Sequence, residues 1–156
     1  MPVVRTVEWD DESVVLIDQR RLPQEETYLR CRRPEEVAAA IRDMAVRGAP
    51  AIGVTAALGI VLGIRTSAAE GAALRAAFEA VCEQMRVTRP TAVNLFWAIE
   101  RMRRRFAREE AGGGRAVRDG LLEEAQAILD EDVASCHRMG DLGAALITRP
   151  SRVLTH

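Results

Sequence analysis

The residues of this chain best suited to chemistry lie at positions 47–53, with the sequence RGAPAIG. Arg47 carries a planar, permanently charged fork that matches the oxygens of a phosphate group. Pro50 suits the first turn of a helix, because it lacks an N–H and its φ is already helical. Gly48 lets the backbone come close to a ligand. The pattern predicts a helix start whose free N–H groups, together with Arg47, could bind an anion. An ordinary helix start beside an arginine paired with a surface carboxylate would use the same residues.

Residues 88–94, with the sequence TRPTAVN, repeat this arrangement. Arg89 directly precedes Pro90, and an apolar stripe with the spacing of an amphipathic helix follows: Leu95, Ile99, Met102 and Phe106. We therefore expect Pro90 to open a helix and Arg89 to lie at its start. Five arginines follow on the other faces of this helix, at positions 101, 103, 104, 105 and 108. Neighbouring glutamates favour a solvated face over a nucleic-acid patch.

Composition narrows the possible functions. The 156 residues are 48% apolar, 29% charged and only 4% aromatic, which favours a globular, mainly helical protein. All 22 basic residues are arginine, so the chain contains no Walker A lysine and no Schiff-base lysine. The net charge of −1 gives no overall attraction to nucleic acid or to a membrane. The three cysteines are far apart in the sequence, and with the two histidines they form no zinc-binding pattern, which favours a reduced cytoplasmic compartment and no metal site.

The elements that must position the two arginines can be read from the periodicity of the chain. Alternating residues predict three strands at 6–9, 13–18 and 27–31. Apolar stripes predict helices from Pro34, at 50–65, at 69–87, from Pro90 and at 116–139, and the glycines at 112–114 predict a flexible loop. Gly59 and Gly63 lie four residues apart, so another helix could approach that face closely. The expected fold class is α+β, mainly α, with a small N-terminal antiparallel sheet followed by a helical bundle.

The last residues suggest a division into domains. Residues 148–151 form a break, and residues 152–155 resemble the start of a strand. We expect a sheet at 1–32, a helical bundle at 33–147, and a linker with the first strand of an absent domain at 148–156. On this interpretation the chain is truncated.

Several stretches together resemble the methylthioribose-1-phosphate isomerase family. In family order they are TVEW (6–9), LIDQRRLP (16–23), AIRDM (40–44), RGAPAIG (47–53), TRPTAVNLFWA (88–98), EDV (131–133) and VLTH (153–156). They extend over nearly the whole chain, and their combination is specific. The RGAP-type loop alone is shared with ribose-1,5-bisphosphate isomerase and with regulatory subunits of the guanine-nucleotide exchange factor of translation initiation.

The resemblance implies a set of site residues. It implies that Arg47, Gly48, Ala49 and Arg89 bind the sugar phosphate. The family's catalytic cysteine follows the Leu-Thr-His element, and its aspartate lies in a Rossmann-like α/β C-terminal domain, so both would lie beyond His156. The resemblance therefore implies no catalytic residue within this chain, no metal and no organic cofactor. It makes Cys31, Cys82 and Cys136 structural or tolerated thiols.

The resemblance implies a function for the full-length protein, and two alternatives remain open. It implies an aldose–ketose isomerase of methionine salvage that is a cytoplasmic homodimer, with this chain contributing substrate binding and inactive alone. Its partners would be a small sugar phosphate and its own C-terminal domain, with no nucleic acid and no membrane. The first alternative is a ribose-1,5-bisphosphate isomerase, and the second is a non-catalytic interaction module like the translation-factor relatives.

Overall fold

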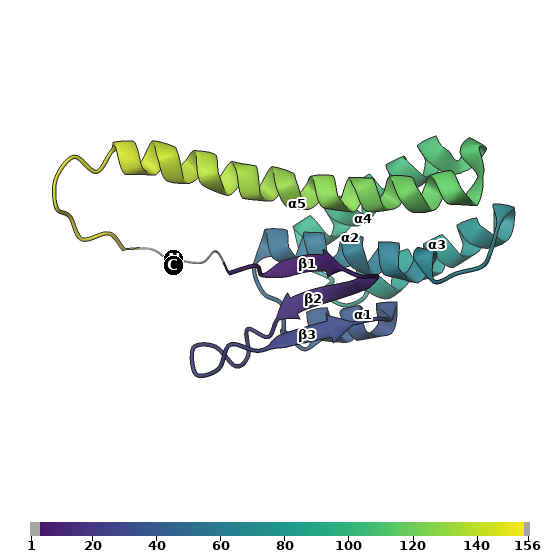
Figure 1. The fold of residues 1–156 in the computed structure, drawn as a ribbon, viewed down its shortest axis with the longest axis horizontal. Coiled ribbons are helices and arrows are strands. Elements are labelled where there is room, and N and C mark those ends of the chain that lie inside the picture. Colours follow the sequence, from purple (N-terminus) through teal and green to yellow (C-terminus); the bar gives the residue numbers. More distant parts are fainter. Residues whose placement is uncertain (1–3, 155–156) are drawn as a thin grey trace.

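A single buried helix, α2 (Ala49–Arg65), runs through the centre of the fold (Figure 1). The computed structural model describes residues 4–154. Helix α2 carries no charge before its last residue, so it can be buried on all sides. It is packed against α1 (Pro34–Arg42), α3 (Gly71–Arg86), α4 (Val93–Glu109) and α5 (Gly113–Ala145). The N-terminal sheet covers the remaining side of α2.

The sheet has three antiparallel strands in the order β1 (Val7–Asp10), β2 (Ser13–Ile17) and β3 (Tyr28–Cys31). Asp11 and Glu12 form the turn between β1 and β2 with positive φ angles of 44° and 57°, as a two-residue hairpin turn requires. Val14 and Leu16 of β2 are fully buried and join the helices in one hydrophobic core. The predicted α+β class and all three strands are confirmed.

Small residues set how closely the helices approach α2. A Cβ at Gly59 would lie 2.8 Å from Val37 of α1, and one at Gly63 would lie 2.8 Å from Val81 of α3. The close approach predicted for these two glycines is confirmed. Phe78 and Phe106 then join α3 to α4, with their ring centroids 4.4 Å apart.

The structure corrects two helix starts. Pro90 does not open a helix: the N–H of Ala92 donates to the carbonyl of Arg89 at 3.0 Å, which closes a reverse turn, and α4 begins at Val93. The fixed φ of proline fits the second position of such a turn as well as it fits a first helical turn. The glycines at 112–114 are not a flexible loop. A short 3₁₀ turn (Glu110–Gly112) leads directly into α5, where Gly114 lies against the Glu70 carboxylate.

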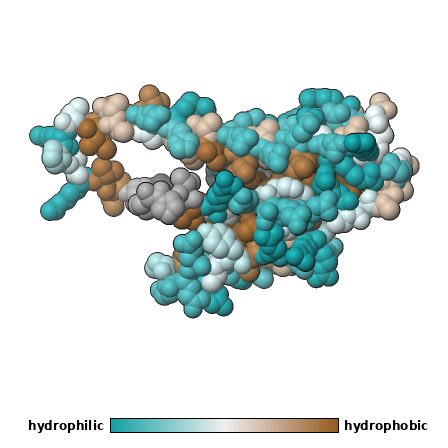
Figure 2. Space-filling view, viewed as in Figure 1, coloured by the Kyte–Doolittle hydropathy of each residue, from teal (hydrophilic) through white to brown (hydrophobic). Residues whose placement is uncertain are grey.

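Helix α5 continues past the end expected at residue 139 and reaches Ala145, so Gly140 does not cap it. Its C-terminal part extends beyond the other helices (Figure 1). Hydrophobic residues gather on this extension and on the segment after it (Figure 2), among them Leu142, Leu146 and Leu154. The break at 148–151 is confirmed, but residues 152–154 are irregular and the strand expected there is absent. Thr155 and His156 lie outside the described residues, and the division into domains stays a prediction.

Candidate functional site

The connection between α1 and α2 delivers Arg47 to the surface. The backbone reverses at Met44, whose φ is +59°, and the N–H groups of Ala45 and Val46 both donate to the carbonyl of Ala40. Ala45 and Val46 are buried, whereas Arg47 and Gly48 are exposed. Gly48 has a φ of +95°, although nothing lies within 4 Å of where its Cβ would be. The backbone conformation, and not lack of space, therefore requires glycine at this position.

Within residues 4–154 the N-terminus of α2 has no side-chain cap. Gly48 is the N-cap, no side chain accepts a hydrogen bond from the first turn, and the first turn contains no acidic residue. Ile52 is the first residue whose N–H is bonded, to the carbonyl of Gly48 at 3.0 Å. Within residues 4–154 the N–H groups of Ala49 and Ala51 have no backbone acceptor. This end of the helix dipole is therefore free to interact with an anion.

The turn that precedes α4 brings Arg89 beside the N-terminus of α2. Gly53 of α2 lies so close to α4 that a Cβ there would be 2.9 Å from the carbonyl oxygen of Asn94. This close packing positions the turn that precedes α4 next to the start of α2. The two segments enclose a cleft of about 330 Å³, lined by Met44, Arg47, Gly48, Ala49, Ile52, Arg89, Thr91 and Ala92.

All four residues that the sequence singled out for binding therefore line one cleft. Within residues 4–154 neither Arg47 nor Arg89 forms an ion pair with a carboxylate, whereas most other arginines of the chain do. Arg47 is exposed and Arg89 is half-buried. Among the residues that the structure describes, the cleft thus combines two guanidinium groups without a carboxylate partner and free backbone donors, a combination suited to a phosphate group. Sequence reasoning did not single out four other residues of the cleft, although all of them lie within the stretches that carry the resemblance: Met44, Ile52, Thr91 and Ala92.

A buried carboxylate, Asp18, directly follows β2. It accepts hydrogen bonds from the backbone N–H of Arg20 at 3.1 Å and from the Arg20 guanidinium at 2.8 Å. The hydrogen bonds from the Arg20 side chain hold the pKa of Asp18 below its usual value. Asp18 therefore stays charged and fixes the backbone that follows β2.

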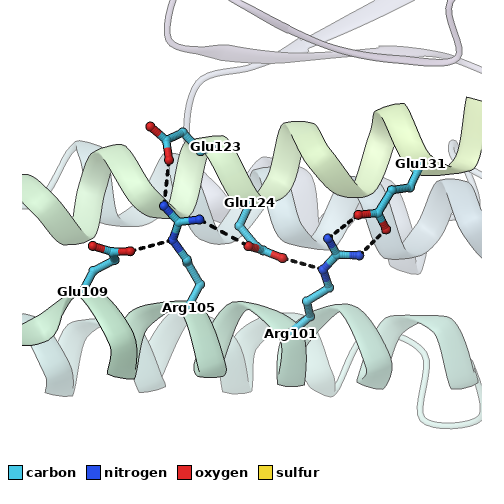
Figure 3. Close-up of polar contacts among 6 residues, drawn as sticks. All are labelled: Arg101, Arg105, Glu109, Glu123, Glu124 and Glu131. Atoms are coloured by element: carbon cyan, nitrogen blue, oxygen red, sulfur yellow. Dashed lines mark hydrogen bonds and ion pairs between the residues drawn. The ribbon is translucent and has the colours of Figure 1, made fainter.

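Two arginines of α4, Arg101 and Arg105, form ion pairs with glutamates of α5. Arg101 is paired with Glu124 and Glu131, and Arg105 with Glu109, Glu123 and Glu124 (Figure 3). Because Glu124 bridges both arginines, these pairs form one network between α4 and α5. The arginines at 101 and 105 were expected on a solvated face, but in the structure they join α4 to α5.

The three cysteines differ in accessibility. Cys31 and Cys82 are buried, and Cys136 is exposed on α5. Burial raises the pKa of the Cys31 thiol to about 11 and that of the Cys82 thiol to about 12. Neither buried thiol is suited to act as a nucleophile, because the thiolate is the reactive form.

We expect iodoacetamide at pH 8 to modify Cys136 alone in the folded chain, because Cys31 and Cys82 are buried and stay protonated. Mass spectrometry after a short reaction should find one modified cysteine, and all three after denaturation. Cys136→Ser is the control and should take up no label while folded. Comparable labelling of Cys31 or Cys82 in the native chain would show that these two thiols are not buried.

Fold and cleft together define a mainly helical domain, capped by a small sheet, with a cationic cleft at the N-terminus of its central helix. None of the helices within residues 4–154 is long and apolar enough to cross a membrane. The chain belongs to the initiation factor 2 subunit family, whose model matches residues 45–156.

Two proteins with high sequence identity to this chain share one name. A protein of Koribacter versatilis named methylthioribose-1-phosphate isomerase is 52% identical over 99% of this chain, and one of Trichlorobacter lovleyi with the same name is 50% identical over 97%. In both cases the chain spans 44% of the relative's length. This chain therefore corresponds to less than half of each of these relatives.

Two solved structures share the fold. The 5-methylthioribose 1-phosphate isomerase of Pyrococcus horikoshii matches with a TM-score of 0.89 and 41% identity, over 92% of this chain and 41% of that one. Subunit delta of the translation initiation factor eIF-2B of A. fulgidus matches with a TM-score of 0.78 and 39% identity, over 84% and 38%. Proteins named for an enzyme and for a translation factor thus have the same fold, so fold alone does not assign a function.

Proposed function

We propose that this chain is the substrate-binding part of an aldose–ketose isomerase that converts 5-methylthioribose 1-phosphate to 5-methylthioribulose 1-phosphate in methionine salvage. The observation that carries the proposal is the convergence of Arg47, Gly48, Ala49 and Arg89 on one cleft at an uncapped helix start. The names of similar proteins support the choice of substrate. The proposed protein is a cytoplasmic homodimer when complete.

Within this proposal the residues of the chain bind and orient the substrate. The two guanidinium groups and the backbone N–H groups of α2 hold the phosphate, and fixing the phosphate limits where the sugar carbons can lie. The proposal takes the catalytic cysteine and aspartate from the part of the enzyme that follows the Leu-Thr-His element. It requires no metal and no organic cofactor.

A non-catalytic role is the second candidate, because the eIF-2B subunit shares the fold at 39% identity. An interaction module has no need for two unpaired arginines around a helix N-terminus. The cleft therefore favours the enzyme over the module. A ribose-1,5-bisphosphate isomerase would use the same phosphate cleft. Only the substrate that the enzyme converts distinguishes it from the first candidate.

The test has a binding arm and a turnover arm. We expect addition of 5-methylthioribose 1-phosphate to the ¹⁵N-labelled 156-residue chain to shift the amide resonances of Gly48, Ala49 and Ala51. We expect the complete product of the gene that encodes this chain to convert 5-methylthioribose 1-phosphate, and the 156-residue chain alone to convert none. 5-Methylthioribose 1-phosphate and ribose 1,5-bisphosphate are assayed in parallel as substrates.

Four outcomes would count against the proposal. Conversion of ribose 1,5-bisphosphate in place of 5-methylthioribose 1-phosphate would favour the first alternative. Absence of any turnover, with capture of exchange-factor subunits in a pulldown, would favour the interaction module. Ligand-induced shifts confined to residues outside the cleft would remove the assigned binding site, and turnover by the 156-residue chain alone would contradict the division of roles.

A further inference from the structure

The segment that follows β2 is tied directly to the loop that carries the cleft residues. The backbone N–H of Gln19 donates to the carbonyl of Ala45 at 2.9 Å. The side-chain Nε2 of Gln19 donates to the carbonyl of Arg47 at 3.2 Å. One residue therefore holds two carbonyls of the loop, including that of the last residue before Gly48.

Gln19 is itself held on both sides. The N–H of Asp18 donates to the carbonyl of Thr27 at 2.9 Å, which joins this segment to the entry of β3. On the other side the buried Asp18 carboxylate binds the backbone N–H and the guanidinium of Arg20. Gln19 thus projects from a backbone whose two neighbours are fixed, so its amide can hold the Arg47 carbonyl at low entropic cost.

The geometry of a peptide bond extends this contact to Gly48. In a planar trans peptide the carbonyl of residue 47 and the N–H of residue 48 point in opposite directions. A donor on the Arg47 carbonyl therefore turns the Gly48 N–H away from Gln19. Gly48 has no Cβ and a φ of +95°. The peptide plane between Arg47 and Gly48 can therefore rotate more freely than one that precedes a residue with a side chain.

We propose that Gln19 is a positioning residue for the phosphate cleft, which it serves by fixing the peptide plane between Arg47 and Gly48 so that the Gly48 N–H is directed toward the bound phosphate. The inference rests on the proposed function, because it assumes that the cleft binds the phosphate of the substrate. Gln19 acts through the backbone and does not line the cleft. Its contribution is distinct from that of the Arg47 guanidinium.

The test replaces the amide of Gln19 and measures binding of 5-methylthioribose 1-phosphate to the 156-residue chain by calorimetry. Gln19→Leu is expected to weaken binding about fivefold, the effect of losing one neutral hydrogen bond. Gln19→Glu keeps the shape but cannot donate, so it should weaken binding at least as much. The amide resonance of Gly48 should move in both variants and lose much of its ligand-induced shift, with the melting temperature little changed.

Gln24→Leu is the matched control, since Gln24 is exposed in the same connection and should bind as the unaltered chain does. A double variant separates the two possible routes of action. If Gln19 acts on the peptide plane, Gln19→Leu should cost the same factor in an Arg47→Ala background, because that background keeps the Arg47 carbonyl. Loss of the effect in that background would mean that Gln19 acts through the guanidinium and would overturn the inference.

Arg89→Ala distinguishes a failure of this inference from a failure of the proposed function. If Arg89→Ala weakens binding and neither Gln19 variant does, the positioning role of Gln19 is wrong, and the cleft is still the phosphate site. If none of these variants changes the affinity, the cleft is not the phosphate site and both proposals fall. Weakening by Gln24→Leu equal to that by Gln19→Leu would also overturn the positioning role.

Discussion

Arg89→Ala is expected to weaken binding of 5-methylthioribose 1-phosphate about 100-fold, from the loss of charge-assisted hydrogen bonds worth about 2–4 kcal/mol. Arg89 lines the cleft, is half-buried, and has no carboxylate partner within residues 4–154 to keep it in place for a structural reason. Its removal should therefore cost affinity and little stability. In the complete gene product the same change should lower kcat/KM, chiefly through KM.

The measurement is the dissociation constant of the 156-residue chain, with the melting temperature recorded alongside. Arg104→Ala is the matched control, because Arg104 is exposed on α4 and outside the cleft. Arg89→Lys should fall between the two, since lysine keeps the charge but loses the planar fork. An Arg89→Ala chain that binds as tightly as the Arg104→Ala chain would remove Arg89 from the site.

The cleft shows which parts of a site a sequence can predict. The start of α2 was predicted to within one residue, because its signals are local: a glycine at the N-cap and a proline in the first turn. The convergence of Arg47 and Arg89 is not local. The residues alone predict two separate helix starts that could each bind an anion, and only the family resemblance assigns both to one site. In the structure the contact between Gly53 and α4 brings Arg47 and Arg89 together.

The errors have a common physical origin. Pro90 fits both a helix start and a reverse turn; the chain forms the turn, and α4 begins at Val93. The glycines at 112–114 favour a loop by propensity, but contacts with distant residues override it. Gly114 is buried against Glu70, which is itself paired with Arg118 of α5. Gln19 is a similar case, since its bond to the Arg47 carbonyl joins residues 28 positions apart.

Gly53→Ala is expected to destabilise the chain by about 2 kcal/mol, within the range for overpacking a tightly packed interior. The new Cβ would lie 2.9 Å from the carbonyl oxygen of Asn94. That oxygen belongs to the first turn of α4, so it cannot rotate away as a side chain could. The two helices must separate, and the cost should exceed the gain of about 1 kcal/mol that alanine brings over glycine within a helix.

The same substitution at Gly140 gives the matched control, because nothing lies within 4 Å of a Cβ there. Gly140→Ala should therefore stabilise the chain by up to about 1 kcal/mol. Urea unfolding measures both free energies of unfolding. Because separation of α2 and α4 would also move the turn that carries Arg89, Gly53→Ala should weaken ligand binding and Gly140→Ala should not. Equal stability of the two variants would show that α2 and α4 are less tightly packed at the cleft than the Gly53 contact indicates, and the convergence of the two arginines would then need another cause.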